Sequence, residues 1–250
     1  MFDVQSMFMP VSGMLSIFQG FFDSNLMGRV IVLLQLASSV VAAAVIIGKR
    51  KELASIERNS RIFKREFLAG KDVLDYYLSR NKGRDSSVEL IYTRSCERMV
   101  KLMDPSIRNA MISNRGGSQS PALTSREVAL VRGTCEHTVE EEEVRIEHGM
   151  GILGTIVNAV PMLGLLGTVW GVLDAFATMG VKQSMLLSEI APAISSALVT
   201  TVVGLLVAIP STCFYNNLAG KIRQLSVDME GFAEELLGRI ACEYQQWEEK

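Results

Sequence analysis

The sequence predicts an all-α membrane protein with three transmembrane helices and long helical extensions on the cytoplasmic side. Three stretches of 19, 25 and 31 residues contain no acidic, basic or histidine side chain, namely residues 30–48, 149–173 and 190–220. About 20 apolar residues are enough to cross the ~30 Å hydrocarbon core of a bilayer. The mean hydropathy of the 250-residue chain is also positive, at +0.25. These observations exclude an ordinary soluble enzyme.

The charge and the cysteine content disfavour several other classes of function. The net charge is −2 and no dense basic stripe is present, which disfavours nucleic acid as a partner. Four cysteines lack paired spacing, which is typical of a reducing compartment or a membrane interior. Cys135 and His137 alone are too few ligands for a metal site. We therefore predict no metal, no cofactor and no enzymatic activity. The cysteines are Cys96, Cys135, Cys213 and Cys242.

The first predicted transmembrane helix covers residues 27–48. Lys49, Arg50 and Lys51 follow it directly, and basic residues mark the cytoplasmic end of a span. The N-terminal segment, residues 1–26, is therefore expected on the outer side of the membrane. Its phenylalanines favour a short helix lying on the outer membrane face, and a disordered end is the alternative.

The second and third predicted transmembrane helices, residues 149–177 and 190–215, form a hairpin. A short connection on the outer side, residues 178–189, joins them. Lys221 is one of two basic residues that follow the third helix closely. They place the C-terminal segment, residues 216–250, in the cytoplasm.

Residues 49–148 form the predicted cytoplasmic helical domain. Within it, the run from Thr124 to Glu127 opens a helix that is expected to continue unbroken into the second span. In the C-terminal segment, six apolar residues recur at steps of three and four. This pattern predicts an amphipathic helix that bundles with the cytoplasmic domain of its own or a neighbouring subunit. The six residues are Ile222, Leu225, Met229, Phe232, Leu236 and Ile240.

Small residues recur at helical spacing in the second and third spans. Such residues let helix backbones approach closely in lipid, where no hydrophobic drive holds helices together. Pro192 and Pro210 lack a backbone donor and can kink or end the third helix. The small residues assigned to helix packing are Gly164, Gly167 and Gly171 in the second span, and Ala197 and Gly204 in the third.

The same two spans carry hydroxyl groups. Ser196, Thr200 and Thr201 cluster in the third span. Two interpretations stay open: the hydroxyls bond to their own carbonyls in a packed interface, or they line a cavity or pore. Neither span contains a central ionisable residue, so if the protein moves ions, a carboxylate has to come from another chain.

Two stretches of sequence resemble a known family. The second-span stretch PMLGLLGTVWGVLDAF and the third-span stretch IAPAISSALVTTVVGLLVAIPSTCFYN are similar to those of the ExbB, TolQ and MotA-like proton-channel proteins. The resemblance is specific over residues 150–217 and only topological before them. Three spans with an outer N-terminus fit ExbB and TolQ better than the four-span MotA-like stators.

This resemblance implies a pentameric ring in the inner membrane of diderm bacteria, with a periplasmic N-terminus and a cytoplasmic C-terminus. Spans two and three would line its pore. A dimer of an ExbD/TolR-like single-span partner would supply the membrane aspartate that carries protons. Proton flow would drive an envelope process such as TonB-type import, Tol-Pal function or gliding, through a TonB-like or TolA-like protein.

The resemblance also assigns individual residues. Thr168 and Thr201 match the family's pore threonines, whose hydroxyls would face the partner's aspartate. Ser196 stands where ExbB and TolQ typically have a glutamate, so the ring lacks a buried carboxylate of its own. Two alternatives remain: a non-conducting structural scaffold, which the missing glutamate favours, and a solute transporter, which the lack of an inverted repeat disfavours.

Overall fold

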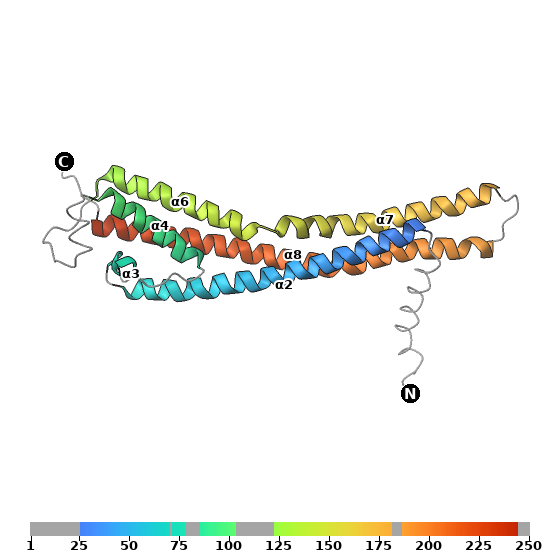
Figure 1. Cartoon of the computed structure of the whole chain (residues 1–250), viewed down its shortest axis with the longest axis horizontal. Coiled ribbons are helices and arrows are strands. Elements are labelled where there is room, and N and C mark those ends of the chain that lie inside the picture. Colours follow the sequence, from blue (N-terminus) through green and yellow to red (C-terminus); the bar gives the residue numbers. More distant parts are fainter. Residues whose placement is uncertain (1–25, 71, 79–85, 104–122, 182–186, 245–250) are drawn as a thin grey trace, which may run out of the picture. The chain divides into compact units, whose positions relative to one another are not determined.

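The computed structural model describes residues 26–70, 72–78, 86–103, 123–181 and 187–244. These residues fold almost entirely into helices (Figure 1). Three of the helices each contain a segment long and apolar enough to cross a membrane, which confirms the predicted all-α class with three spans. They are α2 (Leu26–Ala69), α7 (Met150–Val181) and α8 (Leu187–Tyr244).

Some predicted features lie outside the described residues. They include residues 1–25 of the proposed N-terminal segment, residues 182–186 of the hairpin connection and residues 245–250 of the C-terminal segment. The parts of the hairpin that are described are helical, because α7 runs to Val181 and α8 begins at Leu187.

The described helices divide into two compact units. The apolar unit comprises residues 26–48 and 149–217, and the polar unit comprises residues 49–148 and 218–244. Besides parts of α2 and α8, the polar unit contains α3 (Asp75–Leu78), α4 (Ser87–Leu102) and α6 (Ser125–Glu147).

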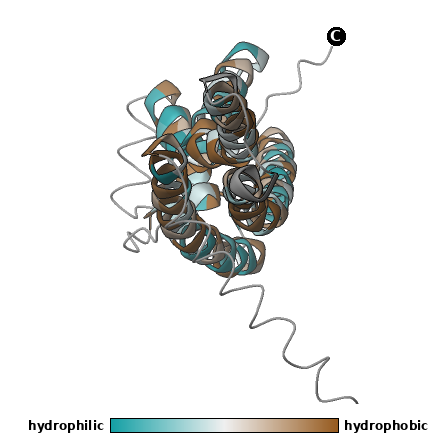
Figure 2. Ribbon diagram, turned by 90° about the vertical axis from the view of Figure 1, so that its right-hand side faces the viewer, coloured by the Kyte–Doolittle hydropathy of each residue, from teal (hydrophilic) through white to brown (hydrophobic). Residues whose placement is uncertain are grey.

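The apolar unit exposes large apolar side chains on all three of its helices. Val40 of α2 and Met162 of α7 are each 70% exposed. In water, apolar exposure costs about 25 cal/mol per Å², whereas a bilayer removes this cost. Brown, apolar turns are prominent on the ribbons in Figure 2. Exposed large apolar side chains of this unit also include Leu165, Phe176, Leu206 and Ile209.

An aromatic cluster forms the core of the polar unit. The Phe63 ring of α2 lies 5.9 Å from the Phe232 ring of α8 and 5.4 Å from the Tyr92 ring of α4. The hydroxyl of Tyr92 donates to the Val73 carbonyl, which satisfies the polar end of a fully buried side chain. All six predicted seam residues of the C-terminal segment are buried, from Ile222 to Ile240, so the predicted packing seam is confirmed.

A capping box begins helix α6, and a glycine with positive φ follows its end. The Thr124 hydroxyl accepts from the Glu127 N–H, and the Glu127 carboxylate accepts from the Thr124 N–H in return. The expected continuity into the second span was wrong. Helix α6 ends at Glu147, and Gly149 adopts a φ of +86° before α7 begins. An αL residue stops an α-helix, and glycine adopts this conformation without steric cost.

The prolines do not end the membrane helices. Pro161 lies inside α7, and Pro192 and Pro210 lie inside α8. Helix α8 is 58 residues long and contains both of these prolines. Pro192 and Pro210 are exposed in the single chain.

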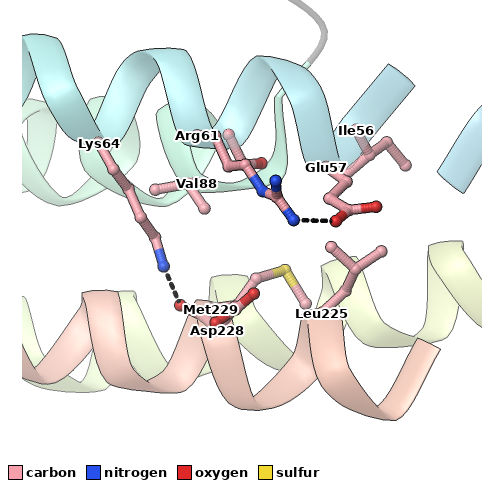
Figure 3. A pocket seen from close by; sticks show the side chains of 9 residues that line it. Ile56, Glu57, Arg61, Lys64, Val88, Leu225, Asp228 and Met229 are labelled. Carbon is pink, nitrogen blue, oxygen red and sulfur yellow. Dashed lines mark hydrogen bonds and ion pairs between the residues drawn. The ribbon is translucent and has the colours of Figure 1, made fainter. Parts of the chain in front are cut away.

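A small cavity lies in the polar unit between α2, α4 and α8 (Figure 3). On one side, Lys64 Nζ donates to the Asp228 carbonyl at 2.8 Å, and Arg61 pairs with Glu57. The cavity volume is about 20 Å³, which is room for a single water molecule and far below that of a substrate pocket.

Candidate functional site

Helices α7 and α8 approach each other closely in the apolar unit, at three glycines of α7. A Cβ atom on Gly164 would lie 3.0 Å from the Cα of Thr201. On Gly167 it would lie 2.3 Å from Thr200 Oγ1, and on Gly171 2.5 Å from Ala197 Cβ. No alanine fits these three positions without movement. The small residues of α7 therefore allow α8 to approach closely.

Two threonine hydroxyls of α8 bond to the same carbonyl of α7. Thr201 Oγ1 donates to the Gly164 oxygen at 2.7 Å, and Thr200 Oγ1 lies 3.2 Å from it. Thr200 Oγ1 is also 2.7 Å from the Ala197 oxygen. A carbonyl oxygen can only accept, so each hydroxyl supplies the proton, and the single Thr200 proton is shared between the nearer Ala197 oxygen and the Gly164 oxygen. The side chain of Thr200 is 1% exposed, whereas that of Thr201 is half-buried.

The other two predicted hydroxyls bond within their own helices. Thr168 Oγ1 donates to the Leu165 oxygen at 2.7 Å, and Ser196 Oγ donates to the Ala193 oxygen at 3.0 Å. Thr168 is half-buried and Ser196 is buried. All four hydroxyls therefore have their protons committed to backbone oxygens, and each retains lone pairs that can accept.

Gln35 of α2 completes this arrangement, and no sequence argument singled it out. Its side chain is 0% exposed, and its Nε2 donates to the Val160 and Thr200 oxygens at 3.4 and 3.1 Å. Gly204 of α8 faces this amide, because a Cβ there would lie 2.8 Å from Gln35 Nε2. An amide inside an otherwise apolar span was the signal that could have found it.

The site contains no acid or base. Residues 149–173 and 190–220 have no acidic, basic or histidine side chain, and Asp174 follows the first of these stretches directly. Among the residues that the structure describes, no group of three His, Cys, Asp or Glu side chains could hold a metal ion. The site therefore offers backbone oxygens, hydroxyl lone pairs and one amide.

Comparison with known proteins places this arrangement in a family. The "Tol-Pal system protein TolQ" of Haemophilus influenzae is 25% identical over 219 residues, which cover 86% of this chain and 89% of that protein. TolQ of Pseudomonas aeruginosa is also 25% identical, over 85% of this chain and 87% of its own. A "Biopolymer transport protein ExbB" of Neisseria gonorrhoeae is 38% identical over 96 residues, 38% of this chain and 44% of that protein.

The sequence profile of one family matches residues 101–231, which is just over half of the chain. The matched region contains α6, α7 and most of α8, and so includes the threonine and glycine contacts described above. The chain is therefore a multi-pass membrane protein that belongs to the MotA/TolQ/ExbB proton channel family.

Proposed function

We propose that the chain is the pore-forming ring subunit of a proton-driven motor in a bacterial inner membrane. Five copies form the ring, the N-terminus is periplasmic and the C-terminus is cytoplasmic. The pathway lies along α7 and α8, where Thr168 and Thr201 are the principal pore residues and Ser196 and Thr200 secondary ones. The observation that carries the proposal is a close-packed hydroxyl surface without any acid or base, because such a surface conducts protons only with a carboxyl from another chain.

That carboxyl comes from an ExbD/TolR-like single-span partner that carries a membrane aspartate. The motor drives an envelope process such as Tol-Pal function, TonB-type import or gliding, through a TonB-like or TolA-like protein. The two long matches to TolQ proteins of the Tol-Pal system support this class of process.

The hydroxyl geometry gives the ring a defined chemical role. Because the protons of Thr168 and Thr201 are committed to backbone oxygens, the hydroxyls offer only lone pairs. Lone pairs accept from a protonated carboxyl and repel a carboxylate. The ring surface therefore favours the neutral form of the partner's aspartate during its passage, as burial in low dielectric also does. A threonine that turns its proton toward the aspartate stabilises the charged form and gives up its backbone bond.

A structural scaffold is the second candidate. The observation that favours it is that every hydroxyl of the site has a backbone partner, as packing alone requires. The motor and the scaffold predict different results when a hydroxyl is removed without a change in side-chain shape.

The substitution Thr201→Val tests the proposal. Valine keeps the β-branched shape, and the Gly164 oxygen retains the Thr200 hydroxyl at 3.2 Å, whose proton it shares with the Ala197 oxygen. We expect an intact complex whose proton flux in proteoliposomes is lower by about tenfold or more, which corresponds to one lost hydrogen bond to the carboxyl. Thr201→Ser keeps the hydroxyl and is expected to retain flux. Unchanged flux in Thr201→Val would favour the scaffold.

The native mass of the detergent-purified complex tests the assembly. The chain, of 27.5 kDa, is expressed with and without the neighbouring genes of its own genome. Five copies are expected in both cases, with two copies of a small single-span protein added when the neighbours are present. A monomer or dimer without a partner under both conditions would contradict the ring and the motor.

A further inference from the structure

The amide of Gln35 joins three membrane helices. It projects from α2, and its nitrogen donates to the Val160 oxygen of α7 and to the Thr200 oxygen of α8. A primary amide has two N–H donors, which is the number needed to bond one acceptor on each of two helices. Because the side chain is fully buried, water does not compete for these bonds.

The glycines beside this amide provide the space that it occupies. A Cβ on Gly204 would lie 2.8 Å from Gln35 Nε2 and 3.0 Å from the Val160 oxygen. A Cβ on Gly164 would lie 3.3 Å from the same nitrogen. These two glycines therefore do more than bring α7 and α8 together. They admit a polar side chain from a third helix between two backbones.

Stability alone does not account for an amide at this position. Gln35 Oε1 is buried, and no protein group in the described part of the chain donates to it. A buried acceptor without a donor carries a desolvation cost that a leucine of similar size does not. What glutamine provides and leucine lacks is a fixed position for two backbone oxygens.

Those two oxygens adjoin the proposed pore threonines. Thr200 directly precedes Thr201, and Val160 lies one helical turn before Gly164, which accepts from Thr201. The bonds of Gln35 therefore constrain how far α8 rotates against α7, and this rotation sets the direction of the Thr201 lone pairs.

We propose that Gln35 is a positioning residue, which clamps α2, α7 and α8 so that Thr201 presents its hydroxyl to the partner's carboxyl. This inference rests on the proposed function of the chain as a proton-conducting ring subunit. It goes beyond that function because it assigns a role to the first span, which does not supply a pore threonine.

The first experiment replaces the amide by an apolar side chain of similar size. In Gln35→Leu, the ring in complex with its partner is expected to keep its native mass and thermal midpoint. Its proton flux is expected to fall by about tenfold or more, because a misdirected Thr201 loses the same hydrogen bond to the carboxyl that Thr201→Val removes. Ser38→Ala is the matched control, because Ser38 lies one turn further along α2 and bonds only to Leu34 of its own helix. Wild-type flux in Gln35→Leu would overturn the proposal.

The second experiment uses Gln35→Glu and needs neither partner nor flux. A protonated carboxyl can donate one hydrogen bond, to one of the two backbone oxygens. A carboxylate donates none and is repelled by both oxygens. The thermal midpoint of the purified ring, relative to wild type at each pH, is therefore expected to fall as the pH rises from about 5 to about 9. Gln35→Leu has no group that titrates at this position, so its thermal midpoint is expected to follow that of wild type at every pH.

The two experiments separate failure of the clamp from failure of the proposed function. A pH-independent difference between Gln35→Glu and wild type would overturn the clamp, whatever the flux. A wild-type complex that passes no protons in the presence of its partner would overturn the proposed function and, with it, the role of the clamp in positioning Thr201.

Discussion

At Gly167, a single hydrogen atom in place of a methyl group allows α7 to contact α8. We expect Gly167→Ala to destabilise the apolar unit by about 1–3 kcal/mol, because the new Cβ would lie 2.3 Å from Thr200 Oγ1 and 2.8 Å from its Cβ. Thermal unfolding of the purified ring measures the effect. Gly151→Ala in the same helix is the matched control, since nothing lies within 4 Å of a Cβ there. Equal midpoints for the two variants would contradict the close approach.

Glu243 couples the stability of the polar unit to pH. Its Oε2 accepts from the Val73 N–H at 3.0 Å, and it faces Asp72, Arg239 and Tyr244. Partial burial, followed by the nearby Asp72 carboxylate, raises the pKa of Glu243 above its usual value of 4.5, despite the opposing Val73 hydrogen bond and Arg239. An acid whose pKa is raised by folding stabilises the native state at low pH and loses this contribution as the pH rises above about 4.5.

We therefore expect Glu243→Gln to remove part of the decline in stability between mildly acidic and neutral pH. The glutamine oxygen still accepts from Val73, while the repulsion with Asp72 disappears. Denaturant unfolding at a series of pH values measures the difference, and Glu234→Gln on the exposed side of α8 serves as the control. A pH profile that matches wild type in both variants would show that Glu243 does not titrate in this range.

How much of the site could be predicted depends on whether its residues recur. Gly164, Gly167 and Gly171 recur at helical spacing, so their place between helices follows from the sequence. Gln35 does not recur, and a lone amide gives no indication of which carbonyls it will reach. The fixed direction of the Thr201 proton is equally invisible, because it depends on a carbonyl 37 residues earlier in the chain.

At the scale of elements, periodicity predicted the packing faces but not where one helix ended. The seam of the C-terminal segment is continuous in sequence and was found from its spacing. The break between α6 and α7 lies at His148 and Gly149, where His148 leaves the helical conformation and Gly149 has a positive φ. Several of the 20 glycines in the chain lie inside helices, so sequence does not distinguish the one that adopts a positive φ.

Alanine substitution at Gly149 tests the break between α6 and α7. Gly149→Ala is expected to destabilise the chain by about 1–2 kcal/mol, since an L-residue in the left-handed region meets a steric clash that glycine avoids. Gly151→Ala, two residues further on and inside α7, is expected to be neutral or slightly stabilising because alanine is the better helix former. Chemical denaturation of both variants measures the contrast. An equally tolerated alanine at residue 149 would show that α6 and α7 can join.

At the scale of the whole molecule, the cysteines report the proposed orientation. Cys242 is exposed in the polar unit, whereas Cys96 and Cys135 are buried. Burial raises the pKa of Cys96 to about 12 and also raises that of Cys135, so neither thiol reacts readily as thiolate. A membrane-impermeant maleimide is expected to label Cys242 in inside-out vesicles and not in intact spheroplasts.

Two controls complete the labelling experiment. Cys213 is also exposed, so the experiment is done in a Cys213→Ser background. In that background Cys242→Ser is expected to abolish the signal, and denaturation is expected to expose Cys96 and Cys135. Labelling of Cys242 in intact spheroplasts would contradict the proposed orientation and place the C-terminus on the periplasmic side.

The Gln35 contacts also have a consequence for how the protein is made. The two carbonyls that the amide binds follow it by 125 and 165 residues. At about 5–20 residues per second, the ribosome therefore adds them roughly 6 to 33 seconds after the amide. During that interval the Gln35 amide of α2 lies in the membrane without its two backbone acceptors. Insertion of α8 supplies the Thr200 acceptor. A chain that ends before residue 200 does not contain this acceptor. In such a fragment the Gln35 amide lacks its Thr200 acceptor, and a polar group without a partner in hydrocarbon is costly.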